Sequence, residues 1–484
     1  FLISSLPLEQ IIDQETAPKV IDYACGAGHF LTEYAVQIRN LVDKNMLKDH
    51  YQNIYGIEKE YRLSKVAKVS AFMYGQDQIN IIYADALAQN KKIKDNTFSV
   101  LIANPPYSVK GFLSTLSPED KQRFELYDNL NEDSFNAIET FFIEKAKQLL
   151  KTWWIAAIIL PSSILTNGNI YIRCREIILK YFDLIAIAEF GSGTFSKTGT
   201  NTATLFLRKK GEKPDLAAHY ANRVETRYNW DFGFDGLFED SPLLASYCEY
   251  CTYDFDQYKN FLMGAESAIF DTEMFKEYQK EAENSPQIKD LKKKKYFKIS
   301  DQQTQTDLLQ KELIQYIKKI EQEKLYYYLL AKTNPNQVLI IKSPEKTEIK
   351  SFLGYERSAT KGNEGIKYLW TTEKSDTDEA IFQSLKGIQG IKTPLFDPND
   401  LSAQDKLNTY IRKHFLNQDF TISPENKKFV SLIPLTDMLD FSRTSFDKAL
   451  RTSVQKKIDI KSKYPLVRLG SVSEVSSWNS APQE

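Results

Sequence analysis

The first 210 residues alternate between short apolar runs and longer amphipathic segments, and this alternation constrains the fold more than any other feature. The apolar runs have strand length and end in glycine or polar residues. Segment 30–46 has helical spacing, with one apolar face made of Phe30, Leu31, Tyr34, Ala35, Ile38, Leu41 and Val42. Strands that alternate with helices predict an α/β fold built on a doubly wound parallel sheet.

The predicted elements place several polar or glycine-rich signals at one edge of that sheet. We expect strands at residues 19–25, 53–58, 80–85, 98–105 and 153–161, helices at 30–46, 61–74 and 135–151, and a closing hairpin from 184–190 and 202–208. Ligands of such sheets bind beyond the carboxyl ends of the strands. That edge would carry residues 25–28, Glu58, Asp85 and Asn104.

Composition excludes several classes of protein. Of the 484 residues, 42% are apolar and 26% charged, which is incompatible with wholesale disorder. The net charge of −1 excludes a uniformly basic coat for nucleic acid, although not a local basic cleft. Four cysteines exclude a disulfide scaffold and fit a reducing cytoplasm, and the apolar runs are too short for a membrane helix. Because the chain starts without Met and ends abruptly, we expect a fragment of a longer protein.

Beyond residue 210 the strand–helix alternation is lost. We expect a catalytic domain at residues 1–210, a helical and mixed region at 211–345, and a mixed connecting region at 346–462. Leu309, Leu313, Ile317 and Ile320 form an amphipathic stripe in the second region. Four consecutive lysines begin at Lys292, and a solvated face is the preferred interpretation over a phosphate-binding patch.

The sharpest chemical motif is Asn104-Pro105-Pro106-Tyr107, which directly follows an apolar strand. Two prolines fix φ and remove two backbone donors, so the loop presents the Asn carboxamide and carbonyl oxygens in a rigid arc. Such an arc can accept two hydrogen bonds from one planar amino group. These bonds would direct the lone pair of the amino nitrogen out of the plane, so that this poor nucleophile can attack. Tyr107 offers a ring on which a base could stack, a contact worth about 1–3 kcal/mol. A rigid strand-end turn without chemistry is the alternative.

Residues 22–30 (DYACGAGHF) form a glycine-rich turn between an expected strand and an expected helix. Gly26 and Gly28 would let the backbone approach a ligand, and the helix N-terminus offers free N–H groups. A dinucleotide fingerprint would need a small residue where Leu31 stands, so NAD is disfavoured.

Two acidic residues end the next two expected strands. Glu58 is placed to accept hydrogen bonds from ribose hydroxyls, and Asp85 from the exocyclic amine of an adenine. Helix capping is the alternative role for each carboxylate. Together with the glycine turn they outline an adenosine-type pocket beside the Asn-Pro-Pro-Tyr loop.

The motifs ACGAGHFL, GIE, YADAL and NPPY, in this order within residues 20–209, resemble the N6-adenine DNA methyltransferases of restriction-modification systems. The resemblance is to type I modification subunits and single-chain type IIG enzymes. It implies a Rossmann-like S-adenosylmethionine-dependent methyltransferase sheet followed by a mostly helical or mixed region. It also implies methyl transfer from S-adenosylmethionine to N6 of a flipped adenine in double-stranded DNA, in the cytoplasm, without a metal or membrane. Specificity and restriction subunits or domains are the implied partners.

The same resemblance assigns individual roles. Asn104 and Pro105 would hold the target amino group, Pro106 would complete the catalytic loop, Tyr107 would stack on the base and Phe195 would cover its other face. The implied cofactor pocket consists of Asp22, Ala24, Cys25, Gly26, Gly28, Phe30, Glu58, Asp85, Asn104 and Phe142.

A second resemblance lies at the C-terminal end. Residues 463–472 (KYPLVRLGSV) are similar to the opening strand of a type I specificity-subunit target recognition domain. We therefore expect residues 463–484 to be the truncated start of such a domain. Residues 354–357 and 361–365 fall where the methyltransferase family keeps a recurrent GY…KG.EG segment.

Other motifs favour structural interpretations. Segment 191–198 imitates a P-loop, but Ser196 replaces the required glycine and a strand follows, so nucleotide hydrolysis is disfavoured. Cys248 and Cys251 form a lone CxxC without a second ligand pair, which disfavours zinc. Cys25 in the glycine turn is interpreted as a packing residue, not a nucleophile.

Two other functions compete with DNA methylation. An Asn-Pro-Pro-Tyr loop can also hold a planar glutamine amide, as in protein glutamine methyltransferases. A non-catalytic scaffold that only holds DNA and partner subunits is the second alternative. The long C-terminal region argues against the first, and the intact glycine turn and Asn104 argue against the second.

Overall fold

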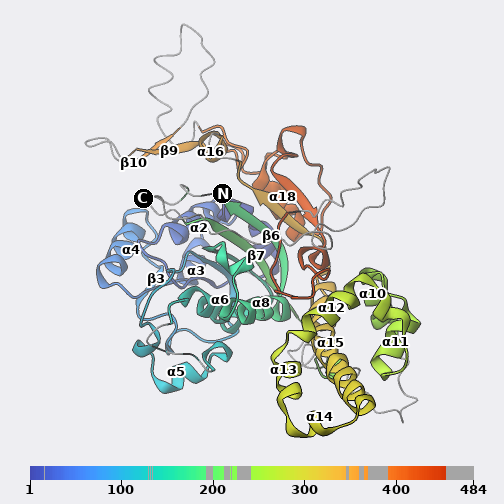
Figure 1. The fold of residues 1–484 in the computed structure, drawn as a ribbon. Helices are drawn as coiled ribbons and strands as arrows, with labels where there is room; N and C mark the ends of the chain where they lie inside the picture. Colours follow the sequence, from blue (N-terminus) through green and yellow to red (C-terminus); the bar gives the residue numbers. More distant parts are fainter. Residues whose placement is uncertain are drawn as a thin grey trace, which may run out of the picture.

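A nine-stranded sheet forms the centre of the molecule, with the strand order β11-β8-β6-β7-β5-β4-β1-β2-β3 (Figure 1). The computed structural model describes residues 1–15, 17–128, 130, 132, 135–191, 194, 200–211, 219, 221–225, 241–344, 348–358, 365–368 and 391–453. Among these residues, no helix is both long and apolar enough to cross a membrane.

Seven strands come from the first 210 residues: β1 (Val20–Asp22), β2 (Ile54–Glu58), β3 (Asn80–Tyr83), β4 (Phe98–Ala103), β5 (Leu150–Pro161), β6 (Phe182–Phe190) and β7 (Thr202–Lys209). The first five are mutually parallel, with Val20 paired to both Ile54 and Val100. Strand β7 lies antiparallel between β5 and β6. The predicted α/β class and the closing hairpin are therefore confirmed.

The helices of this part cover both faces of the sheet: α1 (Leu8–Gln14), α2 (His29–Arg39), α3 (Leu47–Gln52), α4 (Tyr61–Met73), α5 (Pro118–Gln122), α6 (Ile138–Leu149), α7 (Ser163–Thr166) and α8 (Ile170–Tyr181). Alternate strand residues point to opposite faces. Ile21 and Leu101 therefore pack in the core with α6 and α8, whereas Val20 and Val100 pack in the core with α2.

One predicted helix is shorter than its apolar pattern indicated. The helix expected over residues 30–46 ends at Arg39, and Leu41 is left exposed. Asn40, Asp43 and Asn45 lie in the lost part, and their short polar side chains compete with the helical backbone hydrogen bonds.

Two strands from the later part of the chain extend the sheet beyond β6. Strand β8 (Val338–Lys342) pairs parallel to β6, and β11 (Val430–Ile433) pairs antiparallel to β8. Leu339 and Ile340 are fully buried on the two faces of the sheet. An apolar strand such as β6 would otherwise present an open sheet edge. The sheet thus draws strands from outside residues 1–210.

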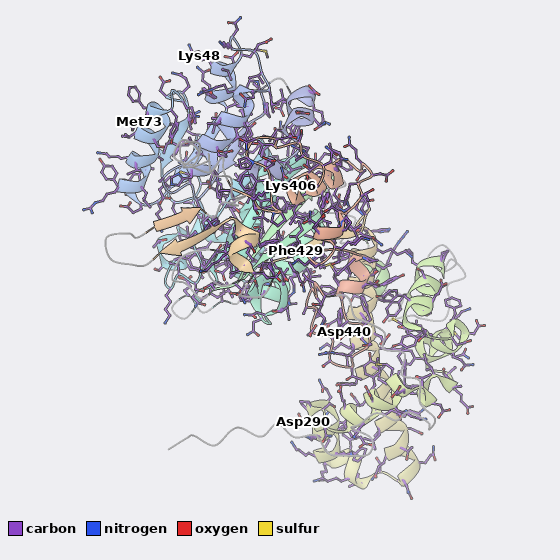
Figure 2. The ribbon with its side chains drawn as sticks, turned by 90° about the horizontal axis from the view of Figure 1, so that it is seen from above. Lys48, Met73, Asp290, Lys406, Phe429 and Asp440 are labelled. Atoms are coloured by element: carbon purple, nitrogen blue, oxygen red, sulfur yellow. The ribbon has the colours of Figure 1, made fainter. Side chains whose placement is uncertain are left out.

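A helical unit projects from the sheet and consists of α10 (Ser241–Cys251), α11 (Phe255–Met263), α12 (Glu273–Glu283), α13 (Pro286–Lys293), α14 (Lys295–Ile299) and the long α15 (Gln302–Lys332). Figure 2 shows Asp290 at the end of this unit that lies farthest from Met73 on α4. The four lysines from Lys292 are all exposed where α13 meets α14. Of the predicted stripe on α15, Ile317 is fully buried and its three partners are partly buried.

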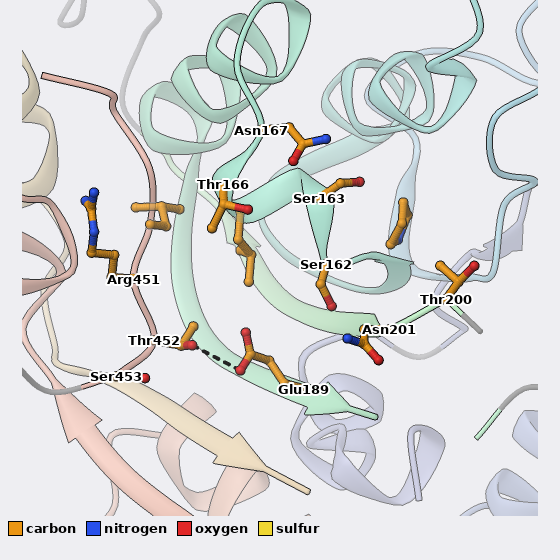
Figure 3. Close-up of a pocket in the computed structure, with 13 residues that line it drawn as sticks. Ser162, Ser163, Thr166, Asn167, Glu189, Thr200, Asn201, Arg451, Thr452 and Ser453 are labelled. Atoms are coloured by element: carbon orange, nitrogen blue, oxygen red, sulfur yellow. Dashed lines mark hydrogen bonds between the residues drawn. The ribbon is translucent and has the colours of Figure 1, made fainter. Parts of the chain in front are cut away.

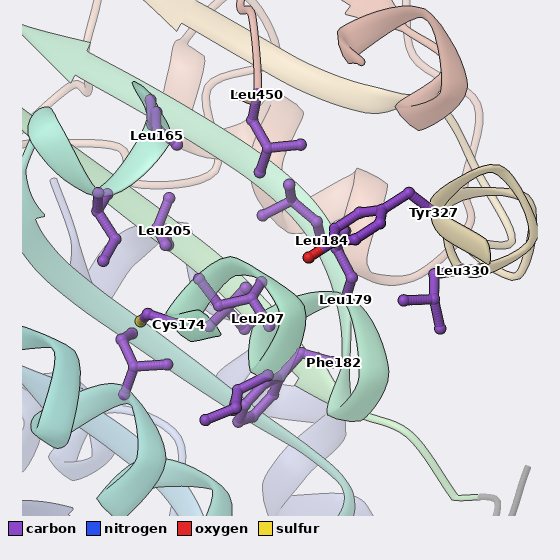
Figure 4. Close-up of a cluster of buried hydrophobic side chains, with 14 of the residues drawn as sticks. Leu165, Cys174, Leu179, Phe182, Leu184, Leu205, Leu207, Tyr327, Leu330 and Leu450 are labelled. Carbon is purple, nitrogen blue, oxygen red and sulfur yellow. The ribbon is translucent and has the colours of Figure 1, made fainter. Parts of the chain in front are cut away.

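Helix α15 connects the helical unit to the sheet. Tyr327 and Leu330 pack against Leu179 and Leu184, next to the strand residues of β6 and β7 (Figure 4). Leu450, from near the end of the described chain, joins the same buried cluster. The core therefore includes all the main parts of the described chain.

The remaining elements are α16 (Ile349–Leu353), α18 (Leu407–Phe415) and a separate antiparallel pair, β9 (Tyr355–Ser358) and β10 (Gly365–Tyr368). Of the GY…KG.EG segment, residues 361–364 lie outside the described residues, and so does the expected recognition-domain start at 463–484.

Candidate active site

The glycine-rich turn leaves the carboxyl end of β1 and enters α2 at His29. Gly26 and Gly28 have φ values of +53° and +84°, a left-handed region that glycine occupies without strain. A Cβ at Gly28 would lie 3.3 Å from the Cβ of Ala67 in α4, whereas a Cβ at Gly26 would meet nothing within 4 Å. Gly28 therefore permits close helix packing, and Gly26 borders open space that a ligand can enter.

Glu58, the last residue of β2, fixes the glycine turn. Its carboxylate accepts hydrogen bonds from the backbone N–H of Gly26 at 2.9 Å and of Glu60 at 2.7 Å. A carboxylate has about four acceptor positions, so roughly two stay available for the hydroxyls of a ribose. The Glu58 carboxylate and the glycine turn are thus linked by a direct hydrogen bond.

Asp22 is a buried carboxyl group at the start of the same turn. It is 1% exposed and accepts a hydrogen bond from the N–H of Ala24 at 2.9 Å. Burial raises the pKa of Asp22 to about 8, the Ala24 hydrogen bond opposes this shift, and the nearby Glu58 adds to it. A buried carboxyl group with a raised pKa is favourable for binding a cation, because the cation would stabilise its charged form.

Asp85 lies just after β3 and forms an ion pair with Lys59. Its carboxylate accepts from the N–H of Leu87 at 3.0 Å and lies 2.7 Å from the Nζ of Lys59. An amine that binds Asp85 must share the carboxylate with Lys59 or displace it. Exposed pairs of this kind contribute only about 0–1 kcal/mol, so displacement costs little.

The Asn-Pro-Pro-Tyr loop follows β4, the strand that pairs directly with β1. Pro105 is buried, Tyr107 is half-buried, and Asn104 and Pro106 are exposed. The Tyr107 hydroxyl donates a hydrogen bond of 2.6 Å to the Asn104 Oδ1 and so orients the carboxamide. Burial, with a smaller contribution from Glu139, raises the pKa of Tyr107, which keeps its hydroxyl protonated as a donor.

Glu139 is a residue of this site that our sequence analysis did not identify. It lies in the first turn of α6 and is fully buried. Its Oε2 accepts from the N–H of Ser108 at 3.0 Å, and its Oε1 accepts from the hydroxyl of Tyr171 in α8 at 2.6 Å. Ser108 has a φ of +53°, which is unfavourable for a non-glycine residue, so Glu139 holds a strained loop end.

One signal in the sequence could have identified Glu139. It precedes Phe142, Ile143 and Ala146 with the spacing of a single helical face. A carboxylate on an otherwise apolar stripe must be paired when it is buried, and therefore holds something in place.

The remaining predicted site residues have different surroundings. Phe142 is 4% exposed, and its ring centroid lies 4.9 Å from that of Tyr23, under the glycine turn. Phe30, the second residue of α2, is partly buried against the core on the side of the sheet that α2 covers. Cys25 is buried, and burial raises the pKa of its thiol, which is unsuitable for a nucleophile. Phe195 lies outside the described residues.

A pocket of about 660 Å³ opens at the same sheet edge beyond β5 and β6 (Figure 3). The pocket and the Asn-Pro-Pro-Tyr loop follow neighbouring strands, because Ala103 of β4 pairs with Ile158 of β5, and β5 continues to Pro161 in the pocket wall. Its lining residues, none of them a predicted site residue, come from the end of β5, α7, β6, the two residues before β7 and residues 450–453.

Acidic, histidine and cysteine side chains are dispersed over the described residues. Within the described ranges, no three His, Cys, Asp or Glu side chains are grouped in a way that could hold a metal ion. Burial raises the pKa of both Cys248 and Cys251 in α10, so both thiols stay protonated.

The chain is similar to restriction-modification proteins. Residues 3–225 match the family model described as N-6 DNA Methylase. The Type II restriction enzyme and methyltransferase RM.Eco57I of Escherichia coli is 23% identical over 249 residues, 40% of this chain and 24% of that protein. The Type I restriction enzyme MpnII methylase subunit of Mycoplasma pneumoniae is 26% identical over 213 residues, 42% of this chain and 38% of that protein. A solved type I methyltransferase subunit from Streptococcus thermophilus is 20% identical with a TM-score of 0.34, covering 44% of each chain.

The chain thus spans about a quarter to two fifths of the length of these curated relatives. The family match extends from residue 3 to residue 225 and includes strands β1 to β7. It therefore contains the glycine turn, Glu58, Asp85 and the Asn-Pro-Pro-Tyr loop. Residues 3–225 of this chain are thus similar to the N-6 DNA methylase family, and the match covers every strand that leads to the candidate site.

Proposed function

We propose that this chain is the catalytic part of a site-specific adenine DNA methyltransferase of a restriction-modification system. It transfers a methyl group from S-adenosylmethionine to N6 of a flipped adenine. The observation that carries this proposal is the arrangement at one sheet edge. Within the region that is similar to the N-6 DNA methylase family, the Asn104 loop leaves β4, next to the strand β1 that leads into the glycine turn.

The glycine turn and its acidic neighbours fit S-adenosylmethionine. This cofactor supplies a methyl group on a cationic sulfonium, which leaves readily. The open space at Gly26 and the buried Asp22 fit a cationic ligand, and Glu58 has acceptor positions left for ribose hydroxyls. Asp85 would bind the adenine amine once Lys59 moves aside.

The Asn-Pro-Pro-Tyr loop fits the acceptor base. The Asn104 Oδ1 has two lone pairs and can accept from an amino group while Tyr107 still donates to it. The carbonyl of Pro105 supplies the second acceptor, so the chain needs only to orient the nitrogen in line with the methyl group. Extrusion of a base costs a few kcal/mol, and stacking on Tyr107 returns about 1–3 kcal/mol.

Double-stranded DNA is the proposed substrate, and a recognition domain and restriction subunits or domains are the proposed partners. These partners agree with the descriptions of the relatives as restriction enzymes and methylase subunits. The cytoplasm is the proposed location, since the DNA substrate and a reducing environment for four free cysteines are found there.

The test is transfer of labelled methyl from S-adenosylmethionine to plasmid DNA by the full-length protein. We expect N6-methyladenine with the wild type and none with Asn104→Ala, which should still bind the cofactor with nearly intact affinity because the other residues of the implied cofactor pocket remain. Asn40→Ala, at the exposed end of α2, serves as the matched control with full activity. Wild-type-like turnover by Asn104→Ala would refute the mechanism.

Two other outcomes would replace the proposed function. Cofactor binding without DNA methylation, together with methylation of a glutamine peptide, would assign a protein substrate. Absence of any cofactor binding would assign a scaffold role.

A further inference from the structure

The pocket beyond β5 and β6 has one wall from a distant part of the chain, residues 448–453, which we name the C-terminal strap. The Nε of Arg175 in α8 donates to the carbonyl of Lys448 at 2.7 Å. The N–H of Leu450 donates to the carbonyl of Leu165 at 2.8 Å, and Leu450 is 1% exposed. The strap is therefore bound to the catalytic domain by backbone and core contacts (Figure 4).

The end of the strap is held by Glu189 at the carboxyl end of β6. The Thr452 hydroxyl donates to the Glu189 Oε2 at 3.0 Å, and Thr452 is 8% exposed (Figure 3). Lys342 of β8 lies 3.6 Å from the same Oε2 and donates to the Ser453 hydroxyl at 2.7 Å. This cluster places Thr452 and Ser453 in the pocket wall.

The lining of the pocket indicates the chemistry of its ligand. Apolar surface from Pro161, Leu165 and Leu450 alternates there with hydroxyl and amide groups of Ser162, Ser163, Thr166, Asn167, Thr200 and Asn201. Arg451 is the one cation among the lining residues, and its guanidinium is 2.5 Å from Asp447 and 3.9 Å from Asp440. The two aspartates offset the charge of Arg451, and Glu189 adds a carboxylate to the pocket wall. The pocket therefore favours a neutral ligand with several hydrogen-bond donors and acceptors over a free phosphate.

We propose that this pocket receives the sugar and base edge of the acceptor nucleotide, and that Thr452 is a positioning residue that holds the strap as its wall. The inference rests on the proposed function. A nucleoside has the neutral hydroxyl, amino and ring-nitrogen groups that such a lining can bind. In the sequence, residues 454–462 separate the strap from segment 463–472, which resembles a recognition-domain opening, so the strap is the described part of the pocket wall nearest to that segment along the chain.

The experiment first maps the methylated sequence in the DNA of cells that express the full-length protein. A duplex of that sequence with 2-aminopurine at the target position then reports base extrusion by fluorescence. Thr452→Val keeps the side-chain shape but loses the hydrogen bond to a charged acceptor, so we expect KM for DNA to rise about tenfold. The value of kcat and the Kd for S-adenosylmethionine should stay unchanged, and the 2-aminopurine signal should require about tenfold more protein.

Two further variants control this test. Thr452→Ser keeps the donor and should restore KM, while Thr97→Val, at the amino end of β4, should behave as the wild type. A wild-type KM and 2-aminopurine signal for Thr452→Val would overturn the inference. Equal losses of Tm, kcat and cofactor binding would also overturn it, since they would show a merely structural role. If the wild type methylates no DNA, the proposed function fails first and the inference falls with it.

Discussion

At the scale of the residue, Glu139 shows how a buried side chain can hold an exposed loop. The loop itself carries the proposed chemistry, but its far end is held from below by a carboxylate that has no access to the substrate. Because Ser108 has an unfavourable backbone conformation, the loop would relax if this acceptor were lost. A shift of about 1 Å in a reacting group can cost roughly a hundredfold in rate.

We therefore predict that Glu139→Leu lowers kcat about a hundredfold while the Kd for S-adenosylmethionine stays near the wild-type value. Glu139→Gln keeps an acceptor for Ser108 and a partner for Tyr171, so it should retain most of the activity. Methyl-transfer kinetics and calorimetric cofactor titration of both variants are the measurements. Equal activity of the two variants would show that the hydrogen bonds of Glu139 do not hold the loop.

A second residue-scale prediction concerns Asp22 and pH. Because burial raises its pKa to about 8, the protonated form is favoured in the folded protein. The associated stability is present below the ordinary pKa of 3.8 and is lost as the pH rises through about 8. A bound cation favours the charged form, so cofactor binding releases a proton below pH 8 and affinity rises by up to about tenfold per pH unit.

The measurement is the shift in Tm on addition of S-adenosylmethionine between pH 6 and pH 8.5. The shift should increase with pH for the wild type and change less for Asp22→Asn, because titration of the ligand itself is common to both. The same pH profile for both proteins would exclude Asp22 from the cofactor site.

At the scale of the element, the helical unit is organised around one buried ion pair. Glu321 and Lys324 of α15 are both fully buried, with 3.5 Å between Lys324 Nζ and Glu321 Oε1. The hydroxyls of Tyr247 and Tyr278, on α10 and α12, donate to Glu321 at 2.8 and 2.6 Å. Lys324 in turn donates to the carbonyl of Phe441 at 2.9 Å, which ties the unit to the chain just before the strap.

Removal of one partner from a buried pair leaves an uncompensated charge. We predict that Glu321→Leu lowers the free energy of unfolding by about 3–5 kcal/mol. Tyr278→Phe removes a single hydrogen bond and should cost about 1–2 kcal/mol. Chemical denaturation, followed by tyrosine fluorescence, measures both. A loss below about 1 kcal/mol for Glu321→Leu would show that this cluster does not hold the helices together.

Most strands and helices of the first 210 residues could be predicted from local sequence patterns. The strands β1 to β7 and the helices α2, α4 and α6 were predictable because their apolar periodicity and their glycine or proline ends lie within short segments. The end of α2 was not, because apolar spacing continues past Arg39 although Asn40 and Asp43 disfavour a helix there.

At the scale of the whole molecule, the later part of the chain extends the sheet that carries the proposed active site. Strands β8 and β11 cover the edge of β6, α15 packs on the face that carries α8, and the strap closes the pocket. The sequence of residues 338–342 (VLIIK) is a short apolar run, and nothing in it indicates which sheet the segment would join. We therefore propose that the division near residue 210 marks a change in sequence pattern more than the limit of a folding unit.

The sequence by itself determined the fold class, and it placed the Asn104 loop and the glycine turn at the ends of strands that the structure shows to be neighbours. These features depend on periodicity and on residues with restricted or permissive backbones, which act over a few positions. Only the tertiary structure decided that Glu139 holds Ser108 across 31 positions and that Thr452 holds Glu189 across 263. A hydrogen bond between distant residues leaves no periodic trace, because its partners become neighbours only when the sheet and its helices have packed.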